Sequence, residues 1–262
     1  MAAVEITTSQ PTPINLASRK FPMQMLCEMA GSIMDVNDNL LEYRHLIKRV
    51  EYRKIWGKAY GNELGRLAQG IGDNIKVTDT ICFTTKQNIP FERRRDITYA
   101  QIVWDYRSGK EEPNRARLVV GGKKIKSPID CGTPIADFFT VKLLLNSVVS
   151  TNRAKFFTLG IKNFYLDTPM ERFEYMRLKI KNIPENMIEK YELKAKKEDG
   201  RVYVEIKKGI YGLPQAGILA NKLLEKRLKK KGYYQSMYTP GLWLHEWRPI
   251  QFSLVVDDFG VK

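Results

Sequence analysis

The sequence predicts an α+β fold in which an antiparallel sheet is backed by helices. Short segments of strand-forming residues lie between turn signals at residues 80–122, and two helical patterns lie near residues 134–150 and 218–231. The third observation is an alternating apolar segment close to the end of the chain. With 262 residues, of which 43% are hydrophobic, the chain suits one large domain or two interleaved lobes around a real core.

The N-terminal segment is expected to be the least ordered part of the fold. Residues 1 to about 20 are rich in Ser, Thr and Pro, and we expect residues 1–50 to form a partly disordered tail and linker. The start of the chain has neither the basic nor the apolar region of a secretory signal. Residues 43–69 then show helical spacing in places, and Gly70 and Gly72 end that segment. The apolar positions of this helix are Trp56, Tyr60, Leu64 and Leu67.

Three short strands are expected next, at residues 80–84, 97–106 and 116–120. Pro90 and the polar run from Lys110 to Asn114 separate them, as turns do. Strands of this length joined by short polar connections favour an antiparallel sheet.

A helix is predicted from Pro134 to Ser150. Thr133 is a suitable cap because its hydroxyl accepts free amide protons, and Pro134 at the first helical position loses no hydrogen bond that it needs. The apolar residues of this helix form one stripe, which predicts a buried face. They are Phe138, Val141, Leu145 and Val148, with Leu144 beside them.

A second helix is predicted from Ile218 to Lys231, and Gly232 ends it. One side of this helix carries four leucines, whereas its last turns carry five cations. These cations complement the helix dipole, and a phosphate-contacting face is the alternative interpretation. The leucines are Leu219, Leu223, Leu224 and Leu228, and the cations are Lys226, Arg227, Lys229, Lys230 and Lys231.

The net charge of +15 favours a polyanionic partner, because each phosphate that a cation neutralises releases counterions. A basic surface that serves solubility alone is the alternative. The three cysteines are widely separated and show no zinc-site spacing, which favours a reducing compartment. No membrane association is expected, because the most apolar stretch, residues 138–149, is shorter than the ~20 residues that a bilayer requires.

Two adjacent carboxylates, Asp257 and Asp258, follow an alternating apolar strand and stand where a tight hairpin turn would begin. Paired carboxylates repel each other unless a cation holds them. Mg²⁺ binds carboxylate oxygens together with substrate phosphates, so an acidic hairpin tip suits the metals of an incoming nucleotide. A solvated turn is the alternative for the pair taken alone.

Four motifs in order give the chain a family resemblance. Lys208–Gly217, Lys-Gly-Ile-Tyr-Gly-Leu-Pro-Gln-Ala-Gly, precedes the leucine helix and then Val255-Val256-Asp257-Asp258. Upstream, Arg115–Gly122 is similar to Lys-Ala-Arg-Leu-Val-Ala-Arg-Gly of the family, and Ile161–Leu166 is similar to its Val-Lys-Asn-Ala-Phe-Leu. In these motifs the chain resembles the reverse transcriptase of copia-type LTR retrotransposons. The resemblance covers residues 55–262.

The resemblance implies a reverse-transcriptase-like polymerase palm with a fingers subdomain, and RNA-templated DNA synthesis that is driven by two Mg²⁺ or Mn²⁺ ions. Asp257 and Asp258 match its catalytic metal ligands. The implied partners are an RNA or DNA template with its primer and deoxynucleoside triphosphates. The implied location is intracellular, in a cytoplasmic particle or the nucleus.

Four further residues match nucleotide-binding positions of the family. Tyr165 matches the bulky residue under the sugar, and Gln215 matches a contact to the incoming nucleotide. Arg115 and Arg117 match the strand whose basic residues contact the triphosphate. We expect only one of these two arginines to face the site, and favour Arg117.

One departure from the family pattern outweighs the matches. Gly160 stands where the family has an aspartate, so the third metal-binding carboxylate is missing. The thumb and RNase H regions of the family are also absent from the sequence. We therefore expect a truncated reverse transcriptase that is inactive as written. Two alternatives remain open: a non-catalytic, basic nucleic-acid-binding remnant, and an unrelated basic protein that has no hairpin near Gly160.

Overall fold

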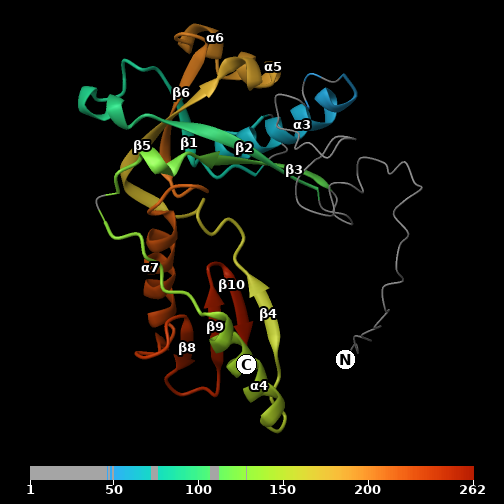
Figure 1. Ribbon diagram of the computed structural model, residues 1–262, viewed down its shortest axis with the longest axis vertical. Helices are drawn as coiled ribbons and strands as arrows, with labels where there is room; N and C mark the ends of the chain where they lie inside the picture. The colour runs from blue at the N-terminus through green and yellow to red at the C-terminus, as the bar shows by residue number, and fades with distance from the viewer. Residues whose placement is uncertain (1–45, 47, 49, 72–75, 107–111, 128) are drawn as a thin grey trace.

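The computed structural model describes residues 46, 48, 50–71, 76–106, 112–127 and 129–262 of the chain. Two five-stranded sheets lie at opposite ends of the described part and form two lobes (Figure 1). The strand order is β1-β6-β5-β2-β3 in the first sheet and β4-β10-β9-β8-β7 in the second. The predicted α+β class is confirmed at this level, whereas most of the predicted N-terminal tail, residues 1–45, lies outside the described residues.

The first lobe contains the three strands predicted from residues 80–120, each within two residues of its expected limits. β2 and β3 form an antiparallel hairpin, but β1 pairs with β6 instead, and β2 meets β5 in parallel. Two strands from later in the chain therefore complete the predicted sheet. The five strands are β1 (Ile81–Thr84), β2 (Thr98–Tyr106), β3 (Asn114–Val120), β5 (Pro169–Lys179) and β6 (Arg201–Lys208).

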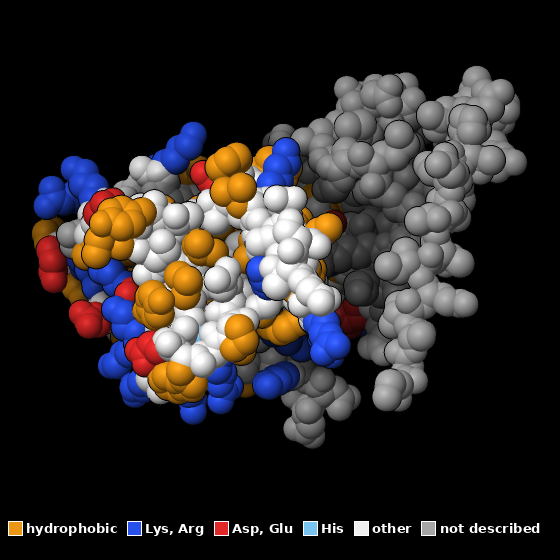
Figure 2. Space-filling model, turned by 90° about the horizontal axis from the view of Figure 1, so that it is seen from below, with side chains coloured by type: hydrophobic (Ala, Val, Ile, Leu, Met, Phe, Trp, Pro, Cys, Tyr) orange, Lys and Arg blue, Asp and Glu red, His pale blue; other side chains and the backbone are white. Residues whose placement is uncertain are grey.

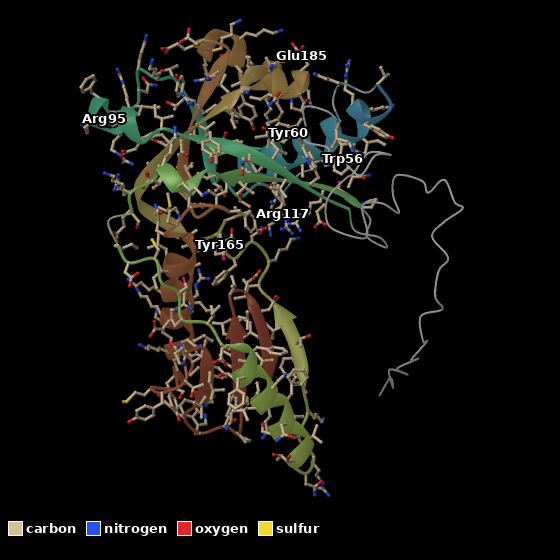
Figure 3. All side chains as sticks on the ribbon, in the orientation of Figure 1. Trp56, Tyr60, Arg95, Arg117, Tyr165 and Glu185 are labelled. Atoms are coloured by element: carbon tan, nitrogen blue, oxygen red, sulfur yellow. The ribbon has the colours of Figure 1, made fainter. Side chains whose placement is uncertain are left out.

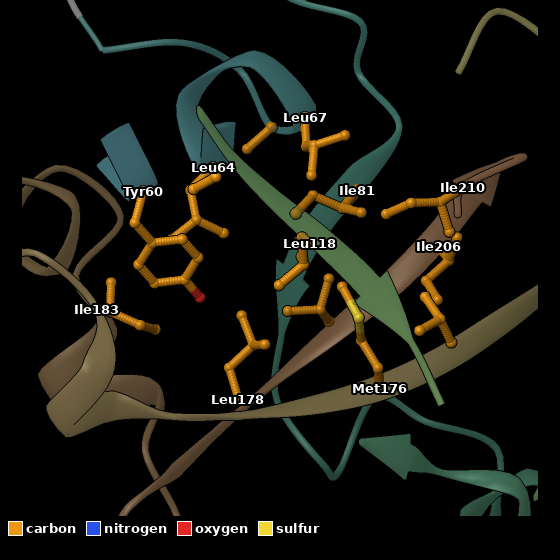
Figure 4. Packing of buried hydrophobic residues seen from close by; sticks show 14 of the residues in the cluster. Tyr60, Leu64, Leu67, Ile81, Leu118, Met176, Leu178, Ile183, Ile206 and Ile210 are labelled. Atoms are coloured by element: carbon orange, nitrogen blue, oxygen red, sulfur yellow. The ribbon is translucent and has the colours of Figure 1, made fainter. Parts of the chain in front are cut away.

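Helix α3 (Val50–Leu67) covers this sheet with the apolar stripe that its spacing predicts. Trp56, Tyr60, Leu64 and Leu67 are all buried in one cluster with residues of the sheet. Figure 4 shows the last three of them among these residues. The remaining helical elements of the lobe are short. They are α5 (Glu185–Lys190), α6 (Leu193–Lys196) and the 3-10 segments Phe91–Asp96, Gly122–Lys124 and Ile180–Asn182.

The second lobe is an antiparallel sheet against which helix α7 (Ala216–Lys229) packs. Ala220 and Leu224 of α7 share a buried cluster with Trp243 and Phe252 of the sheet. The helix begins two residues before its predicted start, and Gly232 follows it at φ +80°, as a left-handed C-terminal glycine does. The strands are β4 (Phe157–Gly160), β7 (Tyr233–Gln235), β8 (Leu242–His245), β9 (Gln251–Val255) and β10 (Asp258–Val261).

Helix α4 (Phe138–Ser150) begins four residues later than predicted. The amide of Ala136 donates to the Leu254 carbonyl at 2.8 Å, which keeps the preceding segment extended against β9. Asp137 therefore caps the helix in place of Thr133, accepting from the Thr140 amide at 2.6 Å.

The predicted buried stripe of α4 is confirmed only at Leu144, which is buried. Phe138 is 74% exposed and Leu145 40% exposed, and the polar Thr140 is buried beside Leu144. Figure 2 views this lobe from below and shows hydrophobic side chains gathered on its surface. Within the described residues, no helix is long and apolar enough to cross a membrane, α4 included.

The two lobes meet where the loop after β6 docks on the end of β3. The Val120 amide donates to the Tyr211 carbonyl at 2.8 Å. Next to it, Gly212 has φ +90°, and a Cβ at this position would overlap the Val120 carbonyl oxygen. Only glycine combines that conformation with that approach.

Two glycine-to-alanine substitutions test this junction. We expect Gly212→Ala to lower the free energy of unfolding by about 2 kcal/mol or more, through backbone strain and overlap with Val120. Gly57→Ala is the matched control, because Gly57 lies inside α3 with open space around it. It should raise the same quantity by roughly 0.5–1 kcal/mol. Urea denaturation measures both, and equal effects would contradict the proposed role of the junction.

Candidate active site

A cavity of about 930 Å³ opens at the junction of the two lobes. It brings together residues from α3, β3, the loop after β6 and the β9–β10 hairpin, which are far apart in the sequence. Four of the six predicted site residues line it: Arg115, Arg117, Asp257 and Asp258. Figure 3 shows Arg117 and Tyr165 at this junction.

Both arginines of β3 line the cavity, so the expectation that only one of them faces it was wrong. Residues two apart on a strand point to the same face, and Ala116 between them packs into the core. The Arg117 guanidinium lies 3.7 Å from the Asp105 carboxylate and 5.7 Å from the centre of the Tyr211 ring. Its Nε is buried without a hydrogen-bond partner among the described residues.

The two aspartates lie on a hairpin, as predicted, but only one of them belongs to the turn. Val256 and Asp257 form the turn, and Asp258 is the first residue of β10. Val256 has φ +60°, which is a strained conformation for a β-branched residue. Asp258 pairs directly with Gly160 of the neighbouring strand β4. The second lobe therefore places the glycine that departs from the family pattern beside the acidic pair.

The two negative charges at the hairpin tip lie close together and disfavour each other. Burial raises the pKa of Asp257, and repulsion from Asp258 raises it further, while Arg117 opposes both effects. Tyr165 lies close enough for the Asp257 charge to add to burial in raising the pKa of its phenol. The Tyr165 ring also meets Tyr211 edge-to-face, with centroids 5.5 Å apart. Tyr165 therefore lies beside the hairpin tip, although it does not line the cavity.

Gln215 is the second predicted site residue that does not line the cavity. Its side chain is buried, and Nε2 donates to Glu174 Oε1 at 3.2 Å. Glu174 is fully buried and also accepts from Arg93 at 2.6 Å. In this arrangement Gln215 joins the start of α7 to β5. Its remaining amide oxygen has no partner among the described residues.

Tyr211, Glu63 and Arg66 are among the cavity residues that the sequence did not predict. Tyr211 belongs to one of the four quoted motifs, but nothing in the pattern indicates that its ring lies beside Arg117. Glu63 and Arg66 are three positions apart on a helix, a spacing at which opposite charges pair. That spacing was available as a signal, although many surface pairs share it.

The acidic pair is the part of the cavity whose side chains could bind a divalent cation. Asp257 and Asp258 provide hard carboxylate oxygens, and a cation between them would relieve the repulsion that raises the Asp257 pKa. No group of three His, Cys, Asp or Glu side chains suited to a metal occurs within the described part of the chain. Gly160, which pairs with Asp258, offers no side-chain oxygen.

A pH titration of stability tests the environment of Asp257. Because the folded state holds this proton more tightly than the unfolded chain, stability falls as pH rises from the ordinary aspartate pKa of about 3.9 through the raised value. We expect Asp257→Asn to be more stable than the unaltered chain at pH 7 and equal to it below about pH 3.9.

Adding Mg²⁺ tests whether the Asp257 carboxylate binds a cation. It should raise the melting temperature of the unaltered chain at pH 7 and leave that of Asp257→Asn unchanged. Asp167→Asn, an exposed carboxylate outside the cavity, is the control and should respond to Mg²⁺ as the unaltered chain does. An identical Mg²⁺ response in Asp257→Asn would show that this carboxylate binds no cation.

Comparisons with known proteins give no independent assignment of this site. No protein-family model matches the chain. Neither a curated protein nor a solved structure matches it. The family resemblance consequently rests on the motifs quoted from the sequence.

Proposed function

We propose that this chain is the fingers and palm of a copia-type reverse transcriptase that keeps its nucleotide cavity and has lost one metal-binding carboxylate. The observation that carries the proposal is the pairing of Gly160 with Asp258. A Cβ built on Gly160 would stand 2.9 Å from Asp258 Oδ1. The position at which the family has its third carboxylate is therefore the position beside the acidic pair.

The meeting of distant motifs is a second support. The segments around residues 115–117, 161–163, 211 and 257–258 all line one cavity. The alternative of an unrelated protein with coincidental motifs expects no acidic hairpin close to Gly160. The β9–β10 hairpin is directly hydrogen-bonded to β4, which ends at that glycine.

The proposed ligand is a deoxynucleoside triphosphate, with an RNA or DNA template and its primer. Arg115 and Arg117 would bind phosphate oxygens from one wall of the cavity and neutralise their charge. Asp257 and Asp258 would hold Mg²⁺ or Mn²⁺ at the hairpin tip. Such an ion, when bound, lowers the barrier by stabilising the charge that develops during phosphoryl transfer. Tyr165 would limit the space below the sugar.

Gly160 is expected to disable the chemistry and leave the ligand site in place. An active family member is expected to use two ions, and the described carboxylates fit one. The contribution of a metal is several kcal/mol, and each ~1.4 kcal/mol changes a rate tenfold. We therefore expect synthesis to be slower by roughly a thousandfold or more than with the carboxylate present.

A non-catalytic nucleic-acid-binding role is the second candidate, and the cationic side chains of the cavity together with the net charge of +15 favour it. Arg66, Lys76, Arg115, Arg117 and Lys162 line the cavity together, which suits a phosphate backbone. Such a remnant would bind template with or without Mg²⁺ and nucleotides. An enzyme, in contrast, would require both to extend a primer.

Primer extension on an RNA template with Mg²⁺ tests the proposal. We expect the unaltered chain to be silent and Gly160→Asp to extend the primer, because the new carboxylate completes the ligand set beside Asp258. Gly160→Asn is the matched control: it adds the same volume without charge and should be silent.

Each other outcome has a distinct meaning. Equal extension by the unaltered chain and Gly160→Asp would show that another group supplies the ligand, and the role given to Gly160 would be wrong. If both are silent and both bind template without Mg²⁺, the binding remnant is the better description. Extension by Gly160→Asn would show that volume, and not charge, restores the reaction.

A further inference from the structure

Helix α3 supplies none of the predicted site residues, yet Glu63 and Arg66 of this helix line the cavity. Glu63 is only 5% exposed, which is unusual for a carboxylate. Its burial is compensated by hydrogen bonds on both oxygens. Oε1 accepts from the backbone amide of Leu118 at 3.3 Å, and Oε2 accepts from Arg66.

The bond to Leu118 fixes the helix to the strand of the two arginines. Leu118 directly follows Arg117 on β3, and its amide is buried. Arg66 then extends the connection, because its Nε and Nη2 both donate to Glu63 Oε2, at 3.0 and 2.6 Å. A guanidinium held through two of its nitrogens has one orientation.

The third nitrogen of Arg66 reaches the segment that leaves the second sheet. Nη1 donates to Asn163 Oδ1 at 2.9 Å. Asn163 has φ +59°, so its side chain is presented from a left-handed turn. Two residues earlier, the Ile161 amide donates to the carbonyl of Asp257 at 2.9 Å. The bonds thus run from the arginine strand to the aspartate turn without using a side chain of either.

We propose that Glu63, Arg66 and Asn163 form a positioning relay that fixes the distance between Arg117 and Asp257 across the cavity. The three are positioning residues, because they act through the backbone on either side. Their effect on nucleotide binding rests on the proposed function, whereas their effect on the two lobes does not. The relay is separate from the backbone junction at Val120 and Tyr211.

Asn163 is the residue at which the relay can be interrupted without exposing an unpaired buried charge. Replacing Arg66 would leave Glu63 as an unpaired buried charge, and the fold itself would suffer. Asn163→Gly removes the acceptor, leaves the Glu63–Arg66 pair intact and tolerates φ +59°. Asn163→Asp is the matched control, because it keeps the acceptor for Arg66 and aspartate also occurs in this backbone region.

The first measurement is the distribution of distances between the lobes. Spin labels replace Lys179 of β5 and Tyr234 of β7, both exposed, in the full chain with its three cysteines changed to serine. We expect double electron–electron resonance spectroscopy to give a broader distribution of label-to-label distances for Asn163→Gly than for the unaltered chain. Asn163→Asp should match the unaltered chain. An unchanged distribution in Asn163→Gly, with an unchanged unfolding midpoint, would overturn the relay.

The second measurement is the affinity for a fluorescent deoxynucleoside triphosphate in the presence of Mg²⁺. Asn163→Gly should bind about tenfold more weakly than the unaltered chain, and Asn163→Asp should bind equally well. A broadened distribution with unchanged affinity would overturn the positioning role. If no chain binds the nucleotide but the distribution broadens in Asn163→Gly, the relay between the lobes stands and the proposed function fails.

Discussion

The close backbone approach between the end of β3 and the loop after β6 is the constraint on which the candidate site depends. Val120 and Tyr211 are joined by a backbone hydrogen bond, and Gly212 lies against the same strand in a conformation that suits glycine. This contact brings the edge of the first sheet next to the second lobe. Together with the bonds through Glu63, Arg66 and Asn163, it holds the arginines and the aspartates around one cavity.

The charged side chains that line the cavity determine which ligands it can bind. The cavity brings the cations of β3 together with the carboxylates of the hairpin tip, and burial and the neighbouring Asp258 both disfavour the charged form of Asp257. Both signs of charge therefore line the same cavity. Under the proposed function, the cations would bind the phosphates of a nucleoside triphosphate and the carboxylates would bind its metal ion.

Local pattern predicted those parts of the fold that depend on neighbours in the sequence. The α3 stripe from Trp56 to Leu67, the β2–β3 hairpin and the glycine end of α7 all follow from spacing and turn chemistry. The α4 stripe did not, because the tether from Ala136 to Leu254 decides which side of that helix meets the sheet. Two residues more than a hundred positions apart in the sequence form this contact, so the spacing of apolar residues within the helix does not reveal it.

The same distinction applies to the site. The motifs predicted which residues gather at the hairpin, whereas Gln215 was misplaced because its partner, Glu174, is a buried acid on a distant strand. Glycine at position 160 has a further consequence for the stability of the hairpin. Under the proposed function, a carboxylate at this position would stand beside Asp258 and add repulsion at the hairpin tip, so glycine lets the hairpin fold without a bound cation. On that proposal, activity and stability make opposite demands on residue 160, because a carboxylate would serve the metal and glycine serves the folding of the hairpin.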